Sequence, residues 1–307
     1  MRLHHTLLGL CLLAGVIPCV SKASNLAGSM KAEPNLRPLT VSHEVTADSS
    51  YVSGVKVRMG NNPFGRITEQ ADSLKYVASL QLNPGMLLRL GGDWQRFSFG
   101  VPPGAPIPNT LQSVAMVVGA DLDLSDGWLL RIETEPGFYS DFRDISFSDF
   151  NSPIIVGFSY LQDENVQWFF GLSVNVRRSI PVFPAMGVRW KFADQWTLMC
   201  VLPKPRLEFQ ALDNLTWYVG GELKGDTYTT GRDFGNQFGI QRLNNTSVDY
   251  TEIRIGSGIS WRVHQGVSLD LEGGCMVDRE FDYHRPDIRI ASNGVAPYVQ
   301  LALHAGF

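Results

Sequence analysis

The stretch from Val114 to Glu135 alternates between apolar and polar residues on both sides of a Ser-Asp-Gly turn. A period of two sends alternate side chains to opposite faces of a β-strand, so the stretch predicts a hairpin with one apolar face. That face has to be covered, either by a second sheet in a soluble sandwich or by lipid around a membrane barrel. Its residues are Val114, Met116, Val118, Ala120, Leu122, Leu124, Trp128, Leu130 and Ile132.

The same alternation continues along the chain and predicts fourteen strands, with twelve or sixteen as the alternatives if boundaries shift. Several reach ten residues or more, whereas strands of globular proteins are mostly about 5–6 residues long. A tilted strand needs roughly 9–11 residues to cross a bilayer. The first strand exceeds that length, which predicts a bend or a periplasmic extension. The ranges are 41–59, 70–82, 86–99, 111–124, 128–138, 153–161, 166–176, 182–192, 196–202, 206–211, 215–224, 248–261, 266–280 and 294–307.

Two kinds of connection alternate between these strands. One kind is a short turn, as at 83–85, 125–127, 162–165, 193–195, 211–214 and 262–265. The other kind is mostly a longer loop, as at 100–110, 139–152, 225–247 and 281–293, with short exceptions at 177–181 and 203–205. Short turns at one end and long loops at the other are typical of an outer-membrane barrel. Pro184 lies inside a predicted strand without a ladder donor, which predicts a bulge or a strand boundary there.

Charged residues avoid the apolar positions of these strands and occupy the opposite ones. In a membrane barrel the opposite positions face the lumen. Eight acidic and five basic residues would line a mildly anionic, cation-favouring aqueous path, or would pair across strands and fill a narrow lumen. These candidate lining residues are Asp121, Asp123, Arg131, Glu133, Glu135, Arg189, Lys191, Glu222, Lys224, Glu252, Arg254, Asp270 and Glu272.

Tryptophan placement favours lipid as the cover of the apolar face. Six tryptophans lie on apolar positions within a few residues of a short turn, and only Trp94 departs from this arrangement. A soluble core has no reason to collect indoles at one end of its hairpins, whereas the membrane interface attracts them. The predicted interfacial girdle consists of Trp128, Trp168, Trp190, Trp196, Trp217 and Trp261. The sequence therefore predicts an all-β, transmembrane, antiparallel up-and-down barrel.

The chain ends in "APYVQLALHAGF", with Leu301, Leu303 and the terminal Phe307 on one face. This segment resembles the C-terminal signal by which Gram-negative outer-membrane barrels are recognised for assembly, although Ala305 stands where an aromatic residue is common. Region 39–307 as a whole resembles an uncharacterised, porin-like outer-membrane barrel family, on elements such as "VDREFDYHRP" (277–286) and "LPKPRLEF" (202–209). The resemblance implies fold and location, and the family carries no assigned activity.

The first 23 residues have an early arginine, an apolar stretch and a small-residue end, which predicts a cleaved signal peptide. Residues 24–38 contain two prolines and predict a periplasmic tether, so the barrel would span 39–307. Cleavage would remove Arg2 and Lys22 and change the net charge from −4 to −6, which excludes a basic nucleic-acid surface. Cys200 and Cys275 would remain on apolar positions, predicted as inert, with a disulfide as the alternative.

Catalytic and metal-binding motifs are weak in this chain. Ser292 begins a Ser-Asn-Gly element that resembles outer-membrane phospholipases, but Ile290 stands where those enzymes have a histidine. A serine without an adjacent base is a poor nucleophile, so a loop is predicted. "DYHRPD" (282–287) offers two aspartates and a histidine, which predicts a solvated loop rather than a metal site. Gly256 and Gly258 predict close packing rather than a phosphate-binding loop. No cofactor is predicted.

The sequence thus predicts a non-catalytic Gram-negative outer-membrane barrel for passage or uptake of small solutes. Its predicted partners are outer-membrane lipid, the barrel-assembly machinery and small solutes. A structural or adhesive barrel with a closed lumen and ligand-binding extracellular loops is the alternative, and a secreted soluble β-sandwich is the third. No feature selects an oligomeric state.

Overall fold

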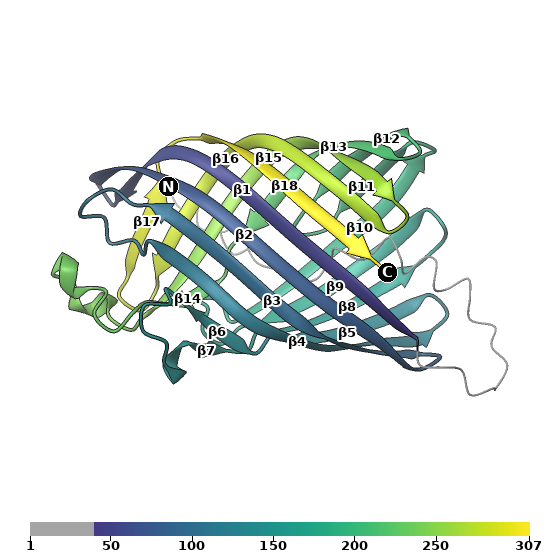
Figure 1. Ribbon diagram of the computed structural model, residues 1–307, viewed down its shortest axis with the longest axis horizontal. Coiled ribbons are helices and arrows are strands. Elements are labelled where there is room, and N and C mark those ends of the chain that lie inside the picture. The colour runs from purple at the N-terminus through teal and green to yellow at the C-terminus, as the bar shows by residue number, and fades with distance from the viewer. Residues whose placement is uncertain (1–39) are drawn as a thin grey trace.

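The computed structural model describes residues 40–307, and these form one antiparallel sheet that closes into a barrel (Figure 1). Closure follows from β1 (Val41–Met59), which pairs with β2 (Asn62–Asn83) on one side and β18 (Ala296–Gly306) on the other. The predicted fold class is confirmed, and the soluble-sandwich alternative is wrong because one closed sheet has no second sheet to pack against. The predicted signal peptide and tether lie outside the described residues.

Fourteen strands make the wall, the number predicted. Besides those three they are β3 (Met86–Gly100), β4 (Thr110–Ser125), β5 (Trp128–Thr134), β8 (Ile154–Leu161), β9 (Val166–Val174), β10 (Val182–Ala193), β11 (Trp196–Cys200), β12 (Arg206–Leu212), β13 (Leu215–Lys224), β15 (Ser247–His264) and β16 (Val267–Tyr283). Short strands prolong four of them: β6 (Gly137–Ser140), β7 (Phe150–Asn151), β14 (Thr227–Thr229) and β17 (Ile288–Ser292). Within residues 40–307, three 3-10 turns lie in the loops: η2 (Phe147–Asp149), η3 (Asn236–Phe238) and η4 (Gln241–Leu243).

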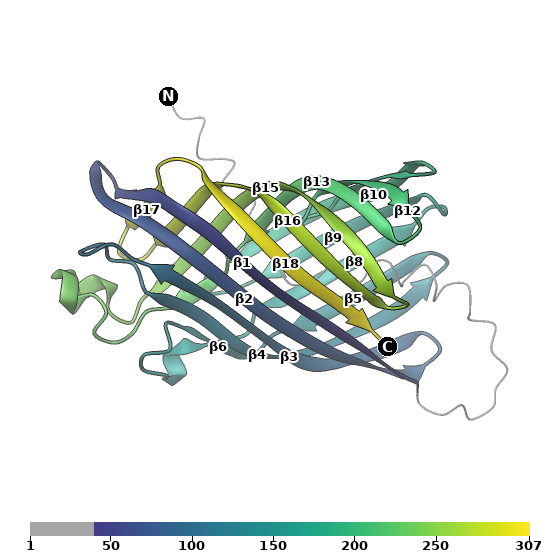
Figure 2. The same ribbon diagram turned by 45° about the horizontal axis from the view of Figure 1, so that its top comes forward.

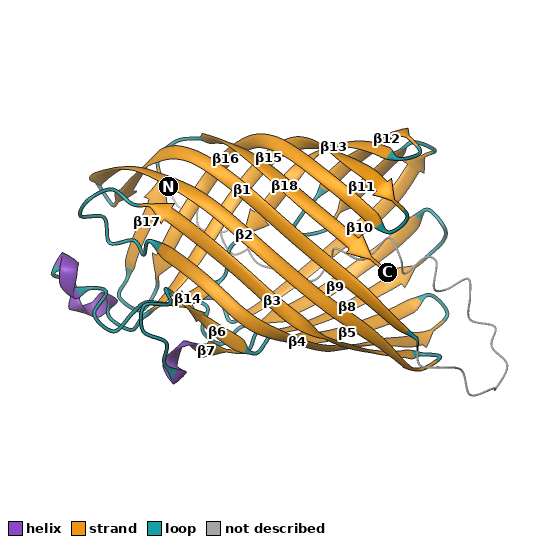
Figure 3. Cartoon of the chain, in the orientation of Figure 1, coloured by secondary structure: helices purple, strands orange, loops and turns teal. Residues whose placement is uncertain are grey.

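The connections sort to the two ends as predicted. All six short turns lie at one end, here called the turn end, together with the C-terminus, and the longer connections and 3-10 turns lie at the other, the loop end (Figure 3). Several boundaries differ from the prediction: β2 starts at Asn62 instead of residue 70, β11 ends at Cys200 instead of residue 202, and β7, β14 and β17 lie in stretches expected to be loops. In the described residues no helix is long and apolar enough to cross a bilayer.

The wall is apolar outside and polar inside over its turn-end half. Met116 is 63% exposed and Leu301 54%, whereas Asp121 and Glu133 are buried. This is the reverse of a soluble protein and the pattern of a barrel in lipid. The six predicted girdle tryptophans all lie near the turn end, where Trp128 stacks on Tyr160 at 4.7 Å between ring centroids.

The loop-end half has the opposite arrangement. In β1 the register shifts between Val52 and Val55, and beyond this bulge Val55 and Val57 are buried inside while Lys56 and Arg58 are exposed. A bulge adds one residue and so exchanges the two faces of a strand. The long first strand therefore contains a bulge, which agrees with the bend predicted for it, and it continues beyond the bulge to the loop end. The loop-end half contains an apolar core formed by residues that include Ile67, Phe97, Phe99, Leu111, Tyr228, Phe234, Val248, Tyr250, Phe281, Tyr283 and Ile290.

Wall height differs around the barrel. Strands β1–β4, β15 and β16 contain 15 to 22 residues, whereas β8–β12 contain 5 to 12. Above the short strands, β6 and β14 meet directly, with Thr229 paired in parallel to Ser140 and the Asp141 N–H donating to the Thr229 carbonyl at 3.2 Å. The loop-end half is thus a narrower ring that omits β8–β12, and Figure 2 shows these strands lying toward the turn end.

Candidate solute passage

The turn-end half encloses a cavity of about 500 Å³. It extends from Ser268 and His304 near the turn end to Tyr139 and Asp226 beneath the narrow ring. Seven acidic and seven basic side chains line it, so these groups contribute no net charge to its wall. They are Asp48, Asp93, Glu135, Glu208, Glu222, Asp226, Asp270, Lys75, Arg178, Arg189, Lys204, Arg206, Lys224 and Arg262.

Most of these charges pair across strands. Lys224 lies 2.9 Å from Asp48, Lys204 lies 2.7 Å from Glu222, and Arg206 lies 3.7 Å from Asp270. Lys75 contacts Glu133 at 2.9 Å and Glu135 at 2.6 Å. Pairing stabilises the ionised groups in a partly desolvated lumen and leaves the wall without an excess of one sign of charge.

The thirteen predicted lining residues fall into three locations. Glu135, Arg189, Glu222, Lys224 and Asp270 line the cavity. Others pair inside the wall: Asp121 with Arg131 at 2.7 Å, Glu133 with Lys75 and Arg89, Glu252 with Arg254, and Glu272 with Tyr298. Asp123 and Lys191 lie close to the turn end, where their backbone N–H groups bond to Gly85 and Asn165.

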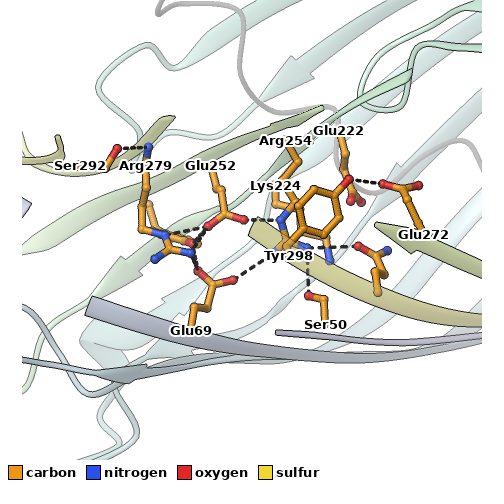
Figure 4. A network of polar contacts seen from close by, with 12 residues as sticks. Ser50, Glu69, Glu222, Lys224, Glu252, Arg254, Glu272, Arg279, Ser292 and Tyr298 are labelled. Atoms are coloured by element: carbon orange, nitrogen blue, oxygen red, sulfur yellow. Dashed lines mark hydrogen bonds and ion pairs between the residues drawn. The ribbon is translucent and has the colours of Figure 1, made fainter. Parts of the chain in front are cut away.

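A cluster of four fully buried charged side chains joins β2 to β15 and β16 inside the barrel (Figure 4). Glu69, Glu252, Arg254 and Arg279 each have a side chain with 0% exposure. Arg254 Nη2 lies 3.0 Å from Glu69, and Arg279 Nη2 lies 2.7 Å from Glu69 while its Nε donates to Glu252 at 2.7 Å. The Tyr250 hydroxyl donates to Glu252 at 2.9 Å. Two carboxylates and two guanidinium groups thus neutralise each other.

Sequence reasoning identified Glu252 and Arg254 in this cluster but missed Glu69 and Arg279. The β15–β16 register shifts between Ile253 and Arg254, so Arg279 points inward although it lies on the opposite parity from Asp270 and Glu272 in the same strand. A pattern that assigns every second residue of a strand to the lumen misses such a residue. A bulge exchanges the two faces of the strand, and its position depends on pairing with the neighbouring strand.

The axial route to the loop end is closed by aromatic packing beyond the charge cluster. Phe97 lies 4.7 Å from Tyr250 between ring centroids, and Phe99 lies 5.3 Å from Tyr250 and 5.1 Å from Phe281. All four side chains are buried within the apolar core. An aqueous path along the axis would have to break both the apolar core and the charge cluster.

The weak motifs have structural roles. A Cβ on Gly256 would lie 2.2 Å from the Tyr298 hydroxyl and one on Gly258 2.5 Å from that of Tyr218, so both glycines make room for lumenal tyrosines, as predicted. The Ser292 hydroxyl accepts a hydrogen bond from the Arg279 N–H at 3.0 Å. Within residues 40–307 no three His, Cys, Asp or Glu side chains gather as a metal site, and Cys200 and Cys275 are free and exposed.

Comparison with solved structures finds several outer-membrane channels. One is the COG4313 outer membrane channel from Pseudomonas putida F1 (TM-score 0.48, 8% identity, covering 90% of this chain and 99% of that one). Another is the Pseudomonas putida toluene transporter TodX (TM-score 0.45, 9% identity, 88% and 90% covered), and a third is the NanC porin (TM-score 0.37, 11% identity, 85% and 98% covered).

No curated protein sequence matches this chain. A family described as a domain of unknown function, DUF6268, matches residues 86–302, from β3 into the last strand. The match confirms the resemblance to an uncharacterised barrel family noted from the sequence. Because it covers more than half of the chain, the protein belongs to the DUF6268 family.

Proposed function

We propose that this protein is a non-catalytic solute passage in the outer membrane of a Gram-negative bacterium, with the turn end toward the periplasm. The proposal is supported by a closed barrel with an apolar exterior and by the polar cavity within its membrane half. The sheet closes through the pairing of β1 with β18, so it has no free first or last strand in hydrocarbon, which suits it to a bilayer. The C-terminal face with Leu301, Leu303 and Phe307 is exposed or half-exposed and would serve recognition by the barrel-assembly machinery.

The cavity is the single observation that carries a transport role. Its volume of about 500 Å³ lies in the range of about 300–1,000 Å³ that small-molecule sites occupy. In the loop-end half of the same barrel, apolar side chains pack across the lumen. A barrel whose role was purely structural would gain stability by filling the turn-end half as well.

The filled loop-end half favours the second candidate, a structural or adhesive barrel with a closed lumen. Its apolar core and four buried charges leave the axial route closed in this structure. The two candidates differ in one measurable property, because only a passage speeds the movement of a solute across a bilayer.

The barrel itself predicts heat-modifiable gel migration. We expect the protein extracted from purified outer membranes to migrate differently before and after boiling, because a closed and extensively hydrogen-bonded sheet resists detergent at room temperature. Absence of a shift, with the protein in the soluble periplasmic or secreted fraction, would contradict the membrane location.

Solute passage predicts faster release from proteoliposomes. Vesicles containing the purified protein are loaded with glucose, with the anionic amphiphile 1-anilinonaphthalene-8-sulfonate (ANS) or with a large dextran, and release is followed in time. We expect at least one small probe to leave faster than from protein-free vesicles and the dextran to be retained. Planar bilayers are expected to show no steady ionic current, since the axial route is closed. Equal release of every probe with and without protein would favour the closed-lumen barrel.

A further inference from the structure

The barrel wall contains a gap beside β10. Strand β10 pairs with β9 from Val182 onward, but its pairing with β11 begins only at Val188, opposite Cys200. In the described residues no backbone hydrogen bond joins Val182–Met186 to the segment 201–205 that follows β11. That segment instead runs beside β13, where the Leu223 N–H donates to the Pro203 carbonyl at 3.0 Å. The two rims of the wall therefore diverge at Cys200.

Prolines lie on both rims of this gap. Pro184 lies on β10, where the register to β9 runs without a shift, so it marks an unpaired strand edge instead of the predicted bulge or boundary. On the opposite rim Pro203 and Pro205 belong to the "LPKPRLEF" element. Proline has no backbone N–H and is confined to strand edges, so these positions cannot donate across the gap. The prolines therefore disfavour backbone pairing between the two rims.

The tip of the β9–β10 hairpin, residues 175–181, bridges the loop-end side of the gap. Arg178 Nη2 lies 3.4 Å from Asp226, in the connection between β13 and β14. The Ser179 N–H donates to Asp249 at 2.9 Å, and Arg177 Nη1 donates to the Thr229 hydroxyl at 3.2 Å. These are polar side-chain contacts on a hairpin tip, so they can break without loss of strand pairing.

The gap lies within the membrane. Along a strand that rises about 3.3 Å per residue and is tilted by about 40°, Met186 and Val182 lie roughly 10 and 20 Å from Trp190 along the barrel axis. The apolar band of a membrane barrel is about 25 Å tall. Met186 is 69% exposed and Val182 50%, as expected for side chains that meet lipid. The β10 rim is therefore at the depth of the hydrocarbon on the loop-end side of the girdle.

The cavity reaches the inner side of the same gap. Its lining includes Val201, Leu202 and Pro203 on one rim, and Arg178 and Asp226 of the bridging contact. Toward the loop end the lumen is closed by the apolar core and the four buried charges. The gap is thus a part of the wall beside the cavity where, among the described residues, no backbone ladder joins the two rims.

We propose that this gap is a lateral door through which small amphiphiles pass between the membrane and the cavity, with the hairpin tip 175–181 as its latch. The proposal rests on the passage function proposed above and specifies its route and solute class. A solute that crosses at this depth must have an apolar part that dissolves in hydrocarbon. The charged cavity receives its polar group, and Arg189, which lines the cavity and interacts electrostatically with Glu208, offers a cation to an anionic one.

The test is reversible closure of the latch. In a background with Cys200→Ser and Cys275→Ser, Arg178→Cys and Asp226→Cys are joined by a bifunctional thiol reagent that dithiothreitol cleaves. Release of ANS from proteoliposomes is expected to fall to the protein-free rate after cross-linking and to recover after cleavage. The matched control joins Asp282→Cys to Arg289→Cys, an ion pair of 3.3 Å in the narrow ring, and is expected to leave release unchanged.

A second variant opens the latch instead. Asp226→Asn removes the charge that holds Arg178, and we expect ANS release to rise by roughly twofold to fivefold, the effect of losing one partly exposed ion pair. Heat-modifiable migration of every variant shows that its barrel is folded.

The outcomes separate the door from the passage function. ANS release that persists after cross-linking at 178 and 226 would overturn the door while leaving a passage. Fast glucose release that ignores the cross-link would also overturn it, because a hydrophilic sugar would then be using an aqueous route. No faster release of any probe by the unmodified protein would refute the passage function itself.

Discussion

Replacing Arg279 with methionine is expected to lower the free energy of unfolding by about 3–5 kcal/mol, the cost of removing one member of a buried ion pair. Arg279 has no exposed side-chain surface and neutralises both Glu69 and Glu252. Without it two carboxylates share Arg254 in a site that water does not reach. The measurement is urea-induced unfolding of the purified barrel in detergent micelles, followed by tryptophan fluorescence and by heat-modifiable migration.

Two further variants show whether burial and charge balance cause the loss. Arg289→Met removes another ion-pairing arginine, but one whose side chain is 47% exposed, and is expected to cost less than about 1 kcal/mol. The double variant Glu69→Gln with Arg279→Met retains the Glu252–Arg254 pair and is expected to be more stable than Arg279→Met alone. Equal stability of Arg279→Met and Arg289→Met would show that the buried charge balance of the cluster does not stabilise the barrel.

The turn-end half of the barrel was predictable from sequence because its side chains alternate between lipid and a polar lumen at every second residue. Lipid outside and a polar lumen inside make each strand alternate, so Val114–Leu124 shows its orientation without knowledge of its neighbours. The tryptophans near the short turns then distinguish lipid from a soluble core. These local signals were sufficient for the strand number, the turn end and the fold class.

The loop-end half was not predictable in this way. There the interior is apolar and the exterior polar, and the bulge after Val52 exchanges the faces in the middle of one strand. A single alternating pattern extended through this point assigns Val55 and Arg279 to the wrong side. Orientation beyond a bulge depends on the partner strand, which one sequence does not identify.

The candidate passage depends on contacts between distant parts of the chain. The Arg254–Glu69 ion pair joins residues 185 positions apart, and Thr229 of β14 meets Ser140 of β6 across five intervening strands. The predicted ranges of β11 and β12 were already short. Only the strand register shows that the backbone pairing of the wall is interrupted beside them. The element "LPKPRLEF" stands out in the sequence, but the sequence alone does not show what its prolines do. In the structure they lie on one rim of the gap, where they have no N–H to donate across it.

Gly91→Ala is the second substitution with a large expected effect, because this lumen-facing position in β3 has no room for a side chain. A Cβ there would lie 1.9 Å from the Tyr76 carbonyl oxygen and 2.9 Å from the Val77 Cα atom, both in the neighbouring strand. Backbone atoms of a paired strand cannot move aside as a flexible side chain can. The β2–β3 ladder would have to separate locally, and we expect a loss of about 3 kcal/mol.

Gly157→Ala is the matched control for that prediction. Gly157 also lies within a wall strand, β8, but a Cβ there would meet no atom within 4 Å. We expect its stability to remain within about 0.5 kcal/mol of the unmodified protein. The two variants are refolded side by side into detergent micelles and compared by the yield of heat-modifiable barrel and the urea midpoint. If Gly91→Ala folds with the yield and midpoint of Gly157→Ala, then the backbones of β2 and β3 lie farther apart at Gly91 than the 1.9 Å Cβ distance implies.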